Sequence, residues 1–199
     1  MPAPRTSDAT SHLRAELIRT AAAIARREGA TALTMRALAH EAGCSLGLLY
    51  KVFADRDEIV AELIAVELDD LSAQFAVWLT DAANHTVAEN LDRYAAILLD
   101  SPVPPLIHSV VLNGRDAEPR IHSAARHPAF IASLDAAVAD YLRLEQQRGR
   151  VRADVDPPAF GFLITGAVHN LVTAGDAYPR PSRPELATIL RNLARGITT

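Results

Sequence analysis

The residues with the clearest chemical meaning lie at positions 34–53, Thr-Met-Arg-Ala-Leu-Ala-His-Glu-Ala-Gly-Cys-Ser-Leu-Gly-Leu-Leu-Tyr-Lys-Val-Phe. Two short segments with helical spacing are separated there by residues 42–44, a three-residue turn that contains Gly43. A turn of this kind lets two helices cross steeply, so that the second can enter the major groove of DNA. The predicted chemistry is therefore recognition of double-stranded DNA by a helix-turn-helix. A plain helical hairpin inside a larger bundle is the alternative.

Helices this short need defined beginnings and ends to hold such residues in place. Thr34 is the expected N-cap of the first, with Leu33 and Leu38 at the two positions of a hydrophobic staple. Gly43 can take the left-handed conformation that ends it, and Ser45 is the expected cap of the second. A small shared core is expected from Met35, Leu38, Ala39, Leu49 and Phe53. The face left for DNA carries Ser45, Leu46, Gly47, Leu48, Tyr50 and Lys51.

The rest of the chain is dominated by helical periodicity, which predicts an all-α fold of about nine helices. A first helix precedes the motif and ends near Gly29, and Asp55 with Glu58 begins a long helix after it, to about Leu79. Further helices are expected near residues 87–98, 106–112, 130–148, 157–171 and 186–197, with a loop at 178–184. We expect two domains: residues 1–55 for DNA and residues 56–199 for effector binding and dimerisation.

This pattern resembles the tetracycline-repressor (TetR) family of bacterial regulators over about residues 13–60. The residues that carry the resemblance are Gly29, Thr31, Thr34, Leu38-Ala39, Ala42-Gly43-Cys44-Ser45, Gly47-Leu48-Leu49-Tyr50, Phe53, Arg56 and Ile59. The resemblance implies a homodimeric repressor whose N-terminal heads bind a palindromic operator. It also implies a C-terminal domain in which a small effector releases that operator.

Carried over residue by residue, the resemblance implies a set of DNA contacts. Thr34 and Arg36 match the beginning of the second helix, where phosphate contacts are common in the family, and Arg56 matches a cation at the beginning of the fourth. Tyr50 and Lys51 are expected to reach phosphates or a base edge. Two positions depart from the family pattern: Leu48 replaces a small residue and Val52 a histidine, so phosphate contacts are better supported than base contacts.

Charge and composition limit the class of protein. The net charge is -4, but residues 1–60 carry eight basic and seven acidic side chains, so the acidity lies beyond the motif. This basic footprint is weak for a nucleic-acid binder and favours binding as a pair of heads. Neither a membrane-spanning run nor a signal peptide is recognisable, which predicts a cytoplasmic protein without a membrane partner. The single cysteine, Cys44, excludes an intrachain disulfide and is expected to be packing.

The C-terminal part contains no recognisable catalytic motif, so we expect no enzyme, no cofactor and no metal site. Aromatic and histidine side chains recur instead on apolar helix faces, as is typical of small-molecule sites between helices. The candidate ligand-binding residues are Phe75, Trp78, Tyr94, His108, Phe130, Tyr141, Phe162 and His169. Their scarcity of charge favours a small, largely apolar effector, although each could equally be core.

The two C-terminal helices are the expected dimer contact. Gly161, Gly166, Ala167 and Gly175 permit close approach, and Leu186, Leu190, Leu193 and Ile197 form a stripe that a subunit's own core would also suit. A helical enzyme and an interaction scaffold without DNA binding are the competing functions. Salt-dependent binding of duplex DNA would separate the regulator from both.

Overall fold

The computed structural model describes residues 6–103, 106, 128–173 and 180–199. The described part contains eight α-helices and two short 3-10 turns, with one isolated bridge between Val151 and Thr198 and no other strand-like pairing. The all-α prediction is confirmed. The helix expected near residues 106–112 lies outside the described residues, apart from Leu106.

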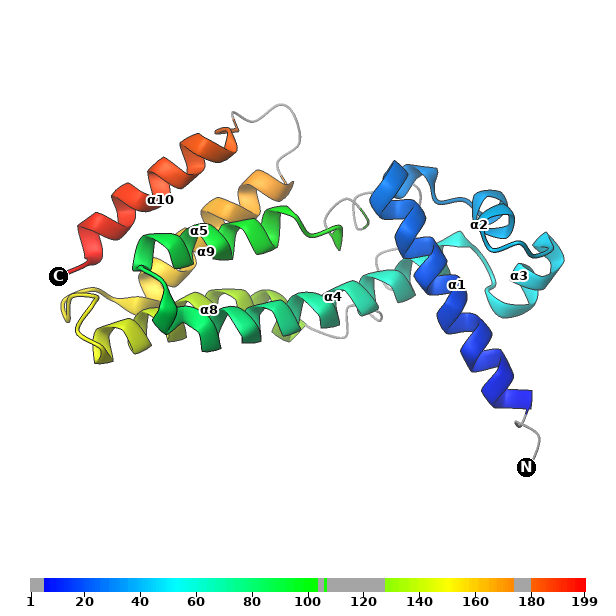
Figure 1. Cartoon of the computed structure of the whole chain (residues 1–199), viewed down its shortest axis with the longest axis horizontal. Helices are drawn as coiled ribbons and strands as arrows, with labels where there is room; N and C mark the ends of the chain where they lie inside the picture. Colours follow the sequence, from blue (N-terminus) through cyan, green and yellow to red (C-terminus); the bar gives the residue numbers. More distant parts are fainter. Residues whose placement is uncertain (1–5, 104–105, 107–127, 174–179) are drawn as a thin grey trace. The chain divides into compact units, whose positions relative to one another are not determined.

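The chain divides into two compact units. The described part of unit 1 is chiefly α1 (Thr6–Glu28), η1 (Ala30–Ala32), α2 (Met35–Glu41), α3 (Leu46–Val52) and the first half of α4 (Arg56–Asp81). Unit 2 takes α4 from Asp69 onward, η2 (Ala82–Asn84) and α5 (Val87–Leu99), then α8 (Pro128–Gln147), α9 (Pro157–Thr173) and α10 (Arg183–Ile197). The helix α4 thus runs through both units (Figure 1).

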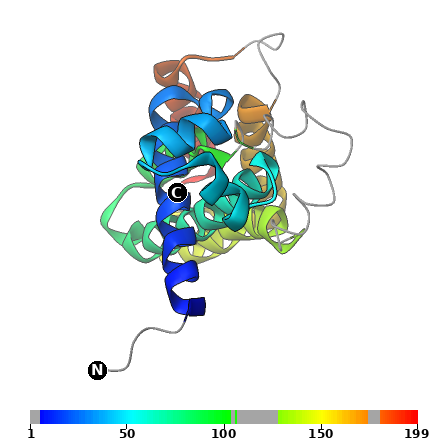
Figure 2. The same ribbon diagram turned by 90° about the vertical axis from the view of Figure 1, so that its right-hand side faces the viewer.

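Unit 1 is built on the long helix α1, which packs against η1 and α2 and is dark blue in Figure 2. Its apolar stripe repeats at helical spacing and is buried, as periodicity requires of a core-facing helix. The buried side chains of the unit come from each of its helices and include Leu17, Ile18, Ala21, Ile24, Leu33, Leu38, Leu49, Phe53, Ile59 and Leu63. All three short elements are therefore anchored on one core.

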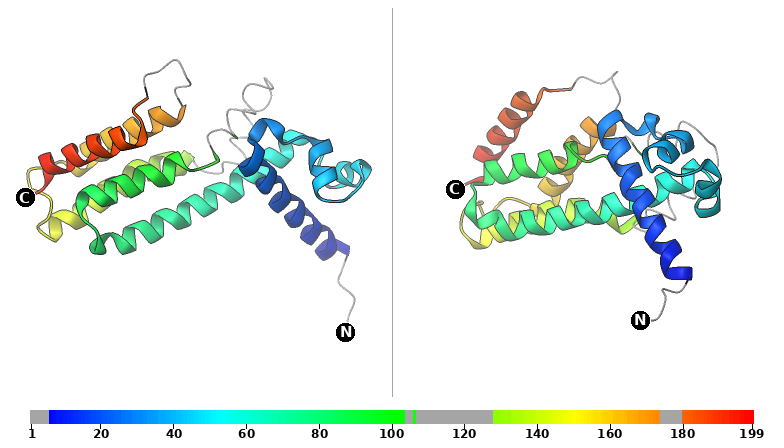
Figure 3. Two further views of the ribbon diagram at one scale, coloured as in Figure 1. Left: turned by 45° about the horizontal axis from the view of Figure 1, so that its top comes forward. Right: turned by 45° about the vertical axis from the view of Figure 1, so that its right-hand side comes forward.

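Unit 2 holds the larger core. In it α8 packs on α9 and α5 packs on both α9 and α10, and α5 and α10 lie side by side in the left view of Figure 3. The helix ends are closed by side chains: Thr86 and Glu89 form a reciprocal capping box at α5. Gly149, with a φ of 71°, terminates the α8 region as expected.

One boundary differs from the sequence prediction. The three prolines of residues 178–184 predict a loop, yet α10 already begins at Arg183. Ser182 is its N-cap, and Ser182 and Glu185 form a second capping box. Pro184 lies in the first turn, where a helix has no use for the missing N–H, so it begins the helix rather than breaking it.

Candidate nucleic-acid interface

The helix-turn-helix of unit 1 has the local geometry that its sequence predicts. The Thr34 hydroxyl oxygen accepts a hydrogen bond from the Ala37 amide at 3.1 Å, and the Ser45 hydroxyl oxygen accepts one from Leu48 at 3.2 Å. Gly43 has a φ of 62° and ends the turn of α2 in the left-handed region. Both helices therefore begin and end at the predicted residues, and α2 packs on α3.

The outer side of α3 carries the side chains that reach solvent. Tyr50 is 54% exposed, and Ser45, Gly47 and Lys51 are exposed as well. Leu46 and Leu48 are half-buried, whereas Leu49 is fully buried. The helix thus separates into an anchored face and a polar face with one cation, as a groove-reading helix requires.

The beginning of α2 adds a second polar site to the same unit. Thr34 and Arg36 are both exposed there. The Thr34 oxygen is occupied as a cap acceptor, but its proton can still be donated to an anion such as a phosphate. The guanidinium of Arg36 offers several donors on a long side chain, which suits a contact to the DNA backbone.

Arg56 lies differently from the expectation that it faces a phosphate. Its Nε donates to the Leu33 carbonyl at 2.6 Å and its Nη2 to the Ala30 carbonyl at 2.9 Å. Its Nη1 lies 3.4 Å from an Asp57 carboxylate oxygen, and the side chain is only 19% exposed. The guanidinium is directed into the unit, where it ties the chain before α2 to the first turn of α4.

The acidic residues beside Arg56 are also engaged within the unit. An Asp55 carboxylate oxygen accepts the Glu58 amide at 2.8 Å and so caps α4. Glu58 accepts hydrogen bonds from the Ala54 amide at 2.7 Å and from Arg14 at 2.6 Å. Partial burial acts to raise the pKa of Glu58, but the bonds from Arg14 and Ala54 outweigh it, so this pKa lies below its usual value. Sequence spacing did not reveal Arg14, because its partners lie 38 or more positions away.

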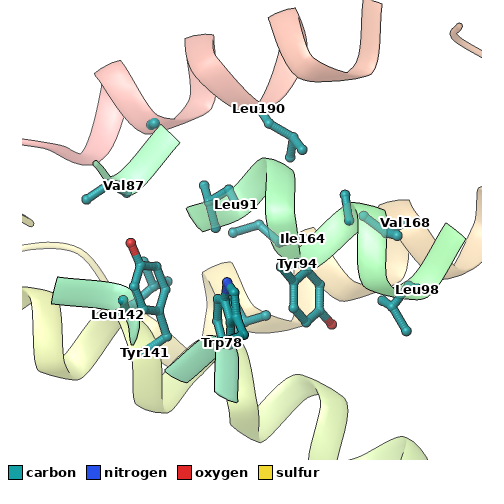
Figure 4. Close-up of a cluster of buried hydrophobic side chains, with 14 of the residues drawn as sticks. Trp78, Val87, Leu91, Tyr94, Leu98, Tyr141, Leu142, Ile164, Val168 and Leu190 are labelled. Carbon is teal, nitrogen blue, oxygen red and sulfur yellow. The ribbon is translucent and has the colours of Figure 1, made fainter. Parts of the chain in front are cut away.

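Four of the candidate ligand-binding residues meet in the core of unit 2. The ring centroid of Trp78 lies 4.9 Å from that of Tyr141 and 5.5 Å from that of Tyr94, and Phe75 lies 5.3 Å from Tyr94. All four are buried, and Figure 4 shows Trp78 between the two tyrosines. We call Phe75, Trp78, Tyr94 and Tyr141 the aromatic cluster.

Two polar contacts lie at the edges of the aromatic cluster. The hydroxyls of Tyr94 and Thr165 are 2.8 Å apart, and the Asn90 amide donates to the Tyr141 hydroxyl at 3.2 Å. Burial raises the pKa of Tyr141 well above its usual value, so its hydroxyl stays protonated. Trp78 donates its indole N–H to the Asn90 carbonyl at 2.9 Å. The cluster is therefore apolar with its own polar atoms paired.

The other candidate ligand-binding residues are not part of this cluster. Phe162 and His169 lie on the exposed side of α9. His108 lies outside the described residues, and the side chain of Phe130 is not described either. Cys44 is half-buried beside the helix-turn-helix turn. Within the described ranges, no three metal-ligating side chains come together.

Comparison with known proteins agrees with this geometry. Residues 17–63, which span most of α1, both helices of the motif and the beginning of α4, match the family model described as bacterial regulatory proteins, tetR family. A comparison with curated proteins finds no significant match. None of the helices in the described part is long and apolar enough to cross a membrane.

Solved structures extend the likeness over nearly the whole chain. A TetR-family regulator from Cytophaga hutchinsonii aligns with a TM-score of 0.69 at 17% identity, covering 96% of each chain. A TetR-family regulator from Pectobacterium atrosepticum gives 0.65 at 19%, covering 98% of each. The ketosteroid transcriptional regulator KstR2 of Mycobacterium tuberculosis gives 0.57 at 22%, covering 94% of this chain and 95% of its own. The predicted resemblance is confirmed: this chain is a TetR-family transcriptional regulator with an N-terminal helix-turn-helix.

Proposed function

We propose that the protein is a homodimeric repressor that leaves a palindromic operator when a small, largely apolar effector binds unit 2. The observation that carries the DNA-binding part is the outer face of α3, where Ser45, Gly47, Tyr50 and Lys51 are exposed on a helix anchored through Leu49. Thr34 and Arg36 at the beginning of α2 supply phosphate contacts in this proposal, and Leu46 and Leu48 offer apolar contact to thymine methyl groups.

The phosphate contacts are tested by the salt dependence of binding. Each cation that neutralises a phosphate releases counterions, so removing one such cation from each head lowers the slope of log K against log[salt] by about one per phosphate. We expect Arg36→Ala and Lys51→Ala each to weaken binding of specific and random duplexes alike and to reduce this slope. Binding is measured by fluorescence anisotropy at several salt concentrations, on an operator selected from a random duplex pool.

A matched control for these variants is Arg19→Ala, which removes an exposed arginine of α1 outside the motif. We expect it to leave both affinity and slope unchanged. Unaltered slopes for Arg36→Ala and Lys51→Ala would contradict the assigned contacts. If the wild-type protein bound no duplex in a salt-dependent manner, the DNA-binding function itself would be refuted.

The effector site is proposed at the aromatic cluster, because this is the large apolar surface that unit 2 offers among its described residues. An apolar molecule inserted there would replace ring contacts by its own, and the Tyr94 and Thr165 hydroxyls could supply one polar contact. Its binding would have to favour a conformation of lower operator affinity, because a ligand shifts an equilibrium only through a difference in affinity between states. This position accounts for four of the candidate residues and leaves Phe162 and His169 to the outer face of α9.

The chain contains a built-in probe for this proposal, since Trp78 is its single tryptophan. An effector at the aromatic cluster is expected to change Trp78 emission at the same concentration at which it weakens operator binding, by roughly 5- to 150-fold. The measurement is a fluorescence titration with apolar and aromatic compounds that release the operator. A compound that releases the operator and leaves Trp78 emission unaltered would place the effector site elsewhere. Trp78→Phe serves as the optical control.

Dimerisation is proposed through α9 and α10, but through other residues than the leucine stripe. Leu186, Leu190 and Ile197 are buried in the core of unit 2 and Leu193 packs against it, so they serve the subunit itself. Exposed instead are Phe162 (66%), Leu163 (59%) and Ile189 (54%), with the small residues Gly166 and Ala167 beside them on α9. We call Phe162, Leu163, Gly166, Ala167 and Ile189 the outer apolar set. Large apolar side chains this exposed are typical of a surface that a partner covers.

A further inference from the structure

Arg14 of α1 holds the end of the DNA-reading helix. Its Nη1 donates to the carbonyl of Val52, the last residue of α3, at 2.7 Å. The last carbonyls of a helix lack partners within the helix and carry partial negative charge, so a guanidinium there satisfies an acceptor and complements the helix dipole. The same guanidinium lies 4.4 Å from the ring centroid of Phe53, the residue that follows α3.

The other side of Arg14 is fixed to α4. Its Nε donates to Glu62 at 2.7 Å, and its Nη2 donates to Glu58 at 2.6 Å. Glu62 and Glu58 are four residues apart, so they lie on one face of α4 and present two carboxylates to one planar guanidinium. Glu58 also accepts the Ala54 amide in the link between α3 and α4. One side chain therefore joins the end of α3 to the first two turns of α4.

Arg56 performs the corresponding task at the other end of the helix-turn-helix. From the first turn of α4 it holds the carbonyls of Ala30 and Leu33, immediately before α2 begins. The chain on both sides of the motif is thus fixed to the beginning of α4 by charge-assisted hydrogen bonds, which are stronger than neutral ones.

From these contacts we infer that Arg14 and Arg56 are positioning residues for DNA recognition, which set the orientation of α2 and α3 without touching DNA. The inference rests on the proposed function, because it concerns how the binding helix is held. A guanidinium suits this task better than an ammonium, since its planar set of donors reaches a carbonyl and two carboxylates at once.

The test compares Arg14→Met with Arg26→Met in the full-length protein. Methionine keeps an unbranched stem and removes every donor. Arg26 is a matched control, because it also lies on α1 and pairs with a carboxylate of α4, Glu67, at 2.5 Å. For Arg14→Met we expect operator affinity per active molecule to fall roughly tenfold to hundredfold, the worth of one charge-assisted hydrogen bond. Arg26→Met should bind as the wild type does.

Two readouts separate positioning from a direct phosphate contact and from a general loss of folding. The salt slope should stay at the wild-type value, whereas the ratio of operator to random-duplex affinity should fall because α3 is no longer held in one orientation. Amide hydrogen exchange at Phe53 and Ala54 should accelerate in Arg14→Met while exchange in the rest of unit 1 does not. Arg14→Lys should recover part of the affinity, and Arg56→Met should repeat the pattern of an unchanged slope.

Each contrary result has a definite meaning. A reduced salt slope in Arg14→Met would show that Arg14 contacts DNA, and unchanged affinity and exchange would show that α3 does not depend on it; either overturns the inference. If Arg14→Met does not fold, Glu62→Gln removes one charge from the same contact with its shape kept, and the same affinity ratio and exchange measurements decide. Absence of salt-dependent binding by the wild type would refute the proposed function instead, so the two failures are distinguishable.

Discussion

Replacing Phe162 and Ile189 by glutamate is expected to yield a folded monomer whose affinity for a two-fold operator is lower by about 100-fold or more. Two linked heads bind with an effective concentration that a single head lacks, so separating them removes the gain from the second head. Both side chains belong to the outer apolar set and are more than half exposed, so the subunit's own core stays intact. Analytical ultracentrifugation gives the oligomeric state, and anisotropy on full and half operators gives the affinities.

The control for this double variant is Val77→Glu. Val77 is also apolar and is 63% exposed, but it lies on α4 and not on α9 or α10. It should remain dimeric and bind the full operator normally. A dimer that persists in the double variant would place the interface elsewhere. Leu190→Arg is unsuitable for this purpose, because Leu190 is buried and a charge there would unfold unit 2.

Replacing Arg150 by methionine is expected to destabilise the protein by about 3–5 kcal/mol, the range for breaking a buried ion pair from one side. Glu145 is fully buried, and it accepts hydrogen bonds from the Nε and the Nη2 of Arg150. Arg150 also donates to the carbonyls of Ala82 and His85, at 3.2 and 2.9 Å, and so joins the end of α8 to the link between α4 and α5. Without it, the Glu145 carboxylate keeps only its bond from Arg148 within the described part of the chain.

Urea unfolding followed by circular dichroism measures this change. Arg143→Met is the matched control, since Arg143 makes an exposed ion pair with Asp140 on the same helix and such pairs contribute little. It should shift the free energy of unfolding by less than about 1 kcal/mol. Adding Glu145→Gln to Arg150→Met should recover part of the stability, because the buried charge is then gone. Equal stability of the Arg150 and Arg143 variants would contradict the assigned role.

The local signals in the sequence were sufficient for most of the helix boundaries. Thr34, Gly43 and Ser45 act on backbone groups within three or four positions of themselves, so the motif is readable without knowledge of the fold. The start of α10 has the same kind of signal in Ser182 and Glu185, but the prolines around Ser182 favour a loop when local composition alone is considered.

The roles of the arginines show where sequence reasoning stops. Arg56 occupies a position at which the family resemblance implies a phosphate contact, yet its guanidinium is directed to carbonyls 23 and 26 positions earlier. Arg14 gave no signal, since Val52, Glu58 and Glu62 become its neighbours only when α1 packs against the rest of unit 1. Likewise, periodicity showed that α9 and α10 are apolar, but not which of their side chains the subunit's own core would use.

By itself, the sequence determined the helical class, the position of the helix-turn-helix, its caps and the family, because these depend on contacts within a turn or two of helix. The tertiary structure decided which cations remain free to face DNA and which are used inside unit 1. It also decided that Leu190 is core and that Phe162 is surface. The physical reason is the same in each case: a guanidinium or an apolar side chain has no role until long-range packing determines which partners lie within its reach.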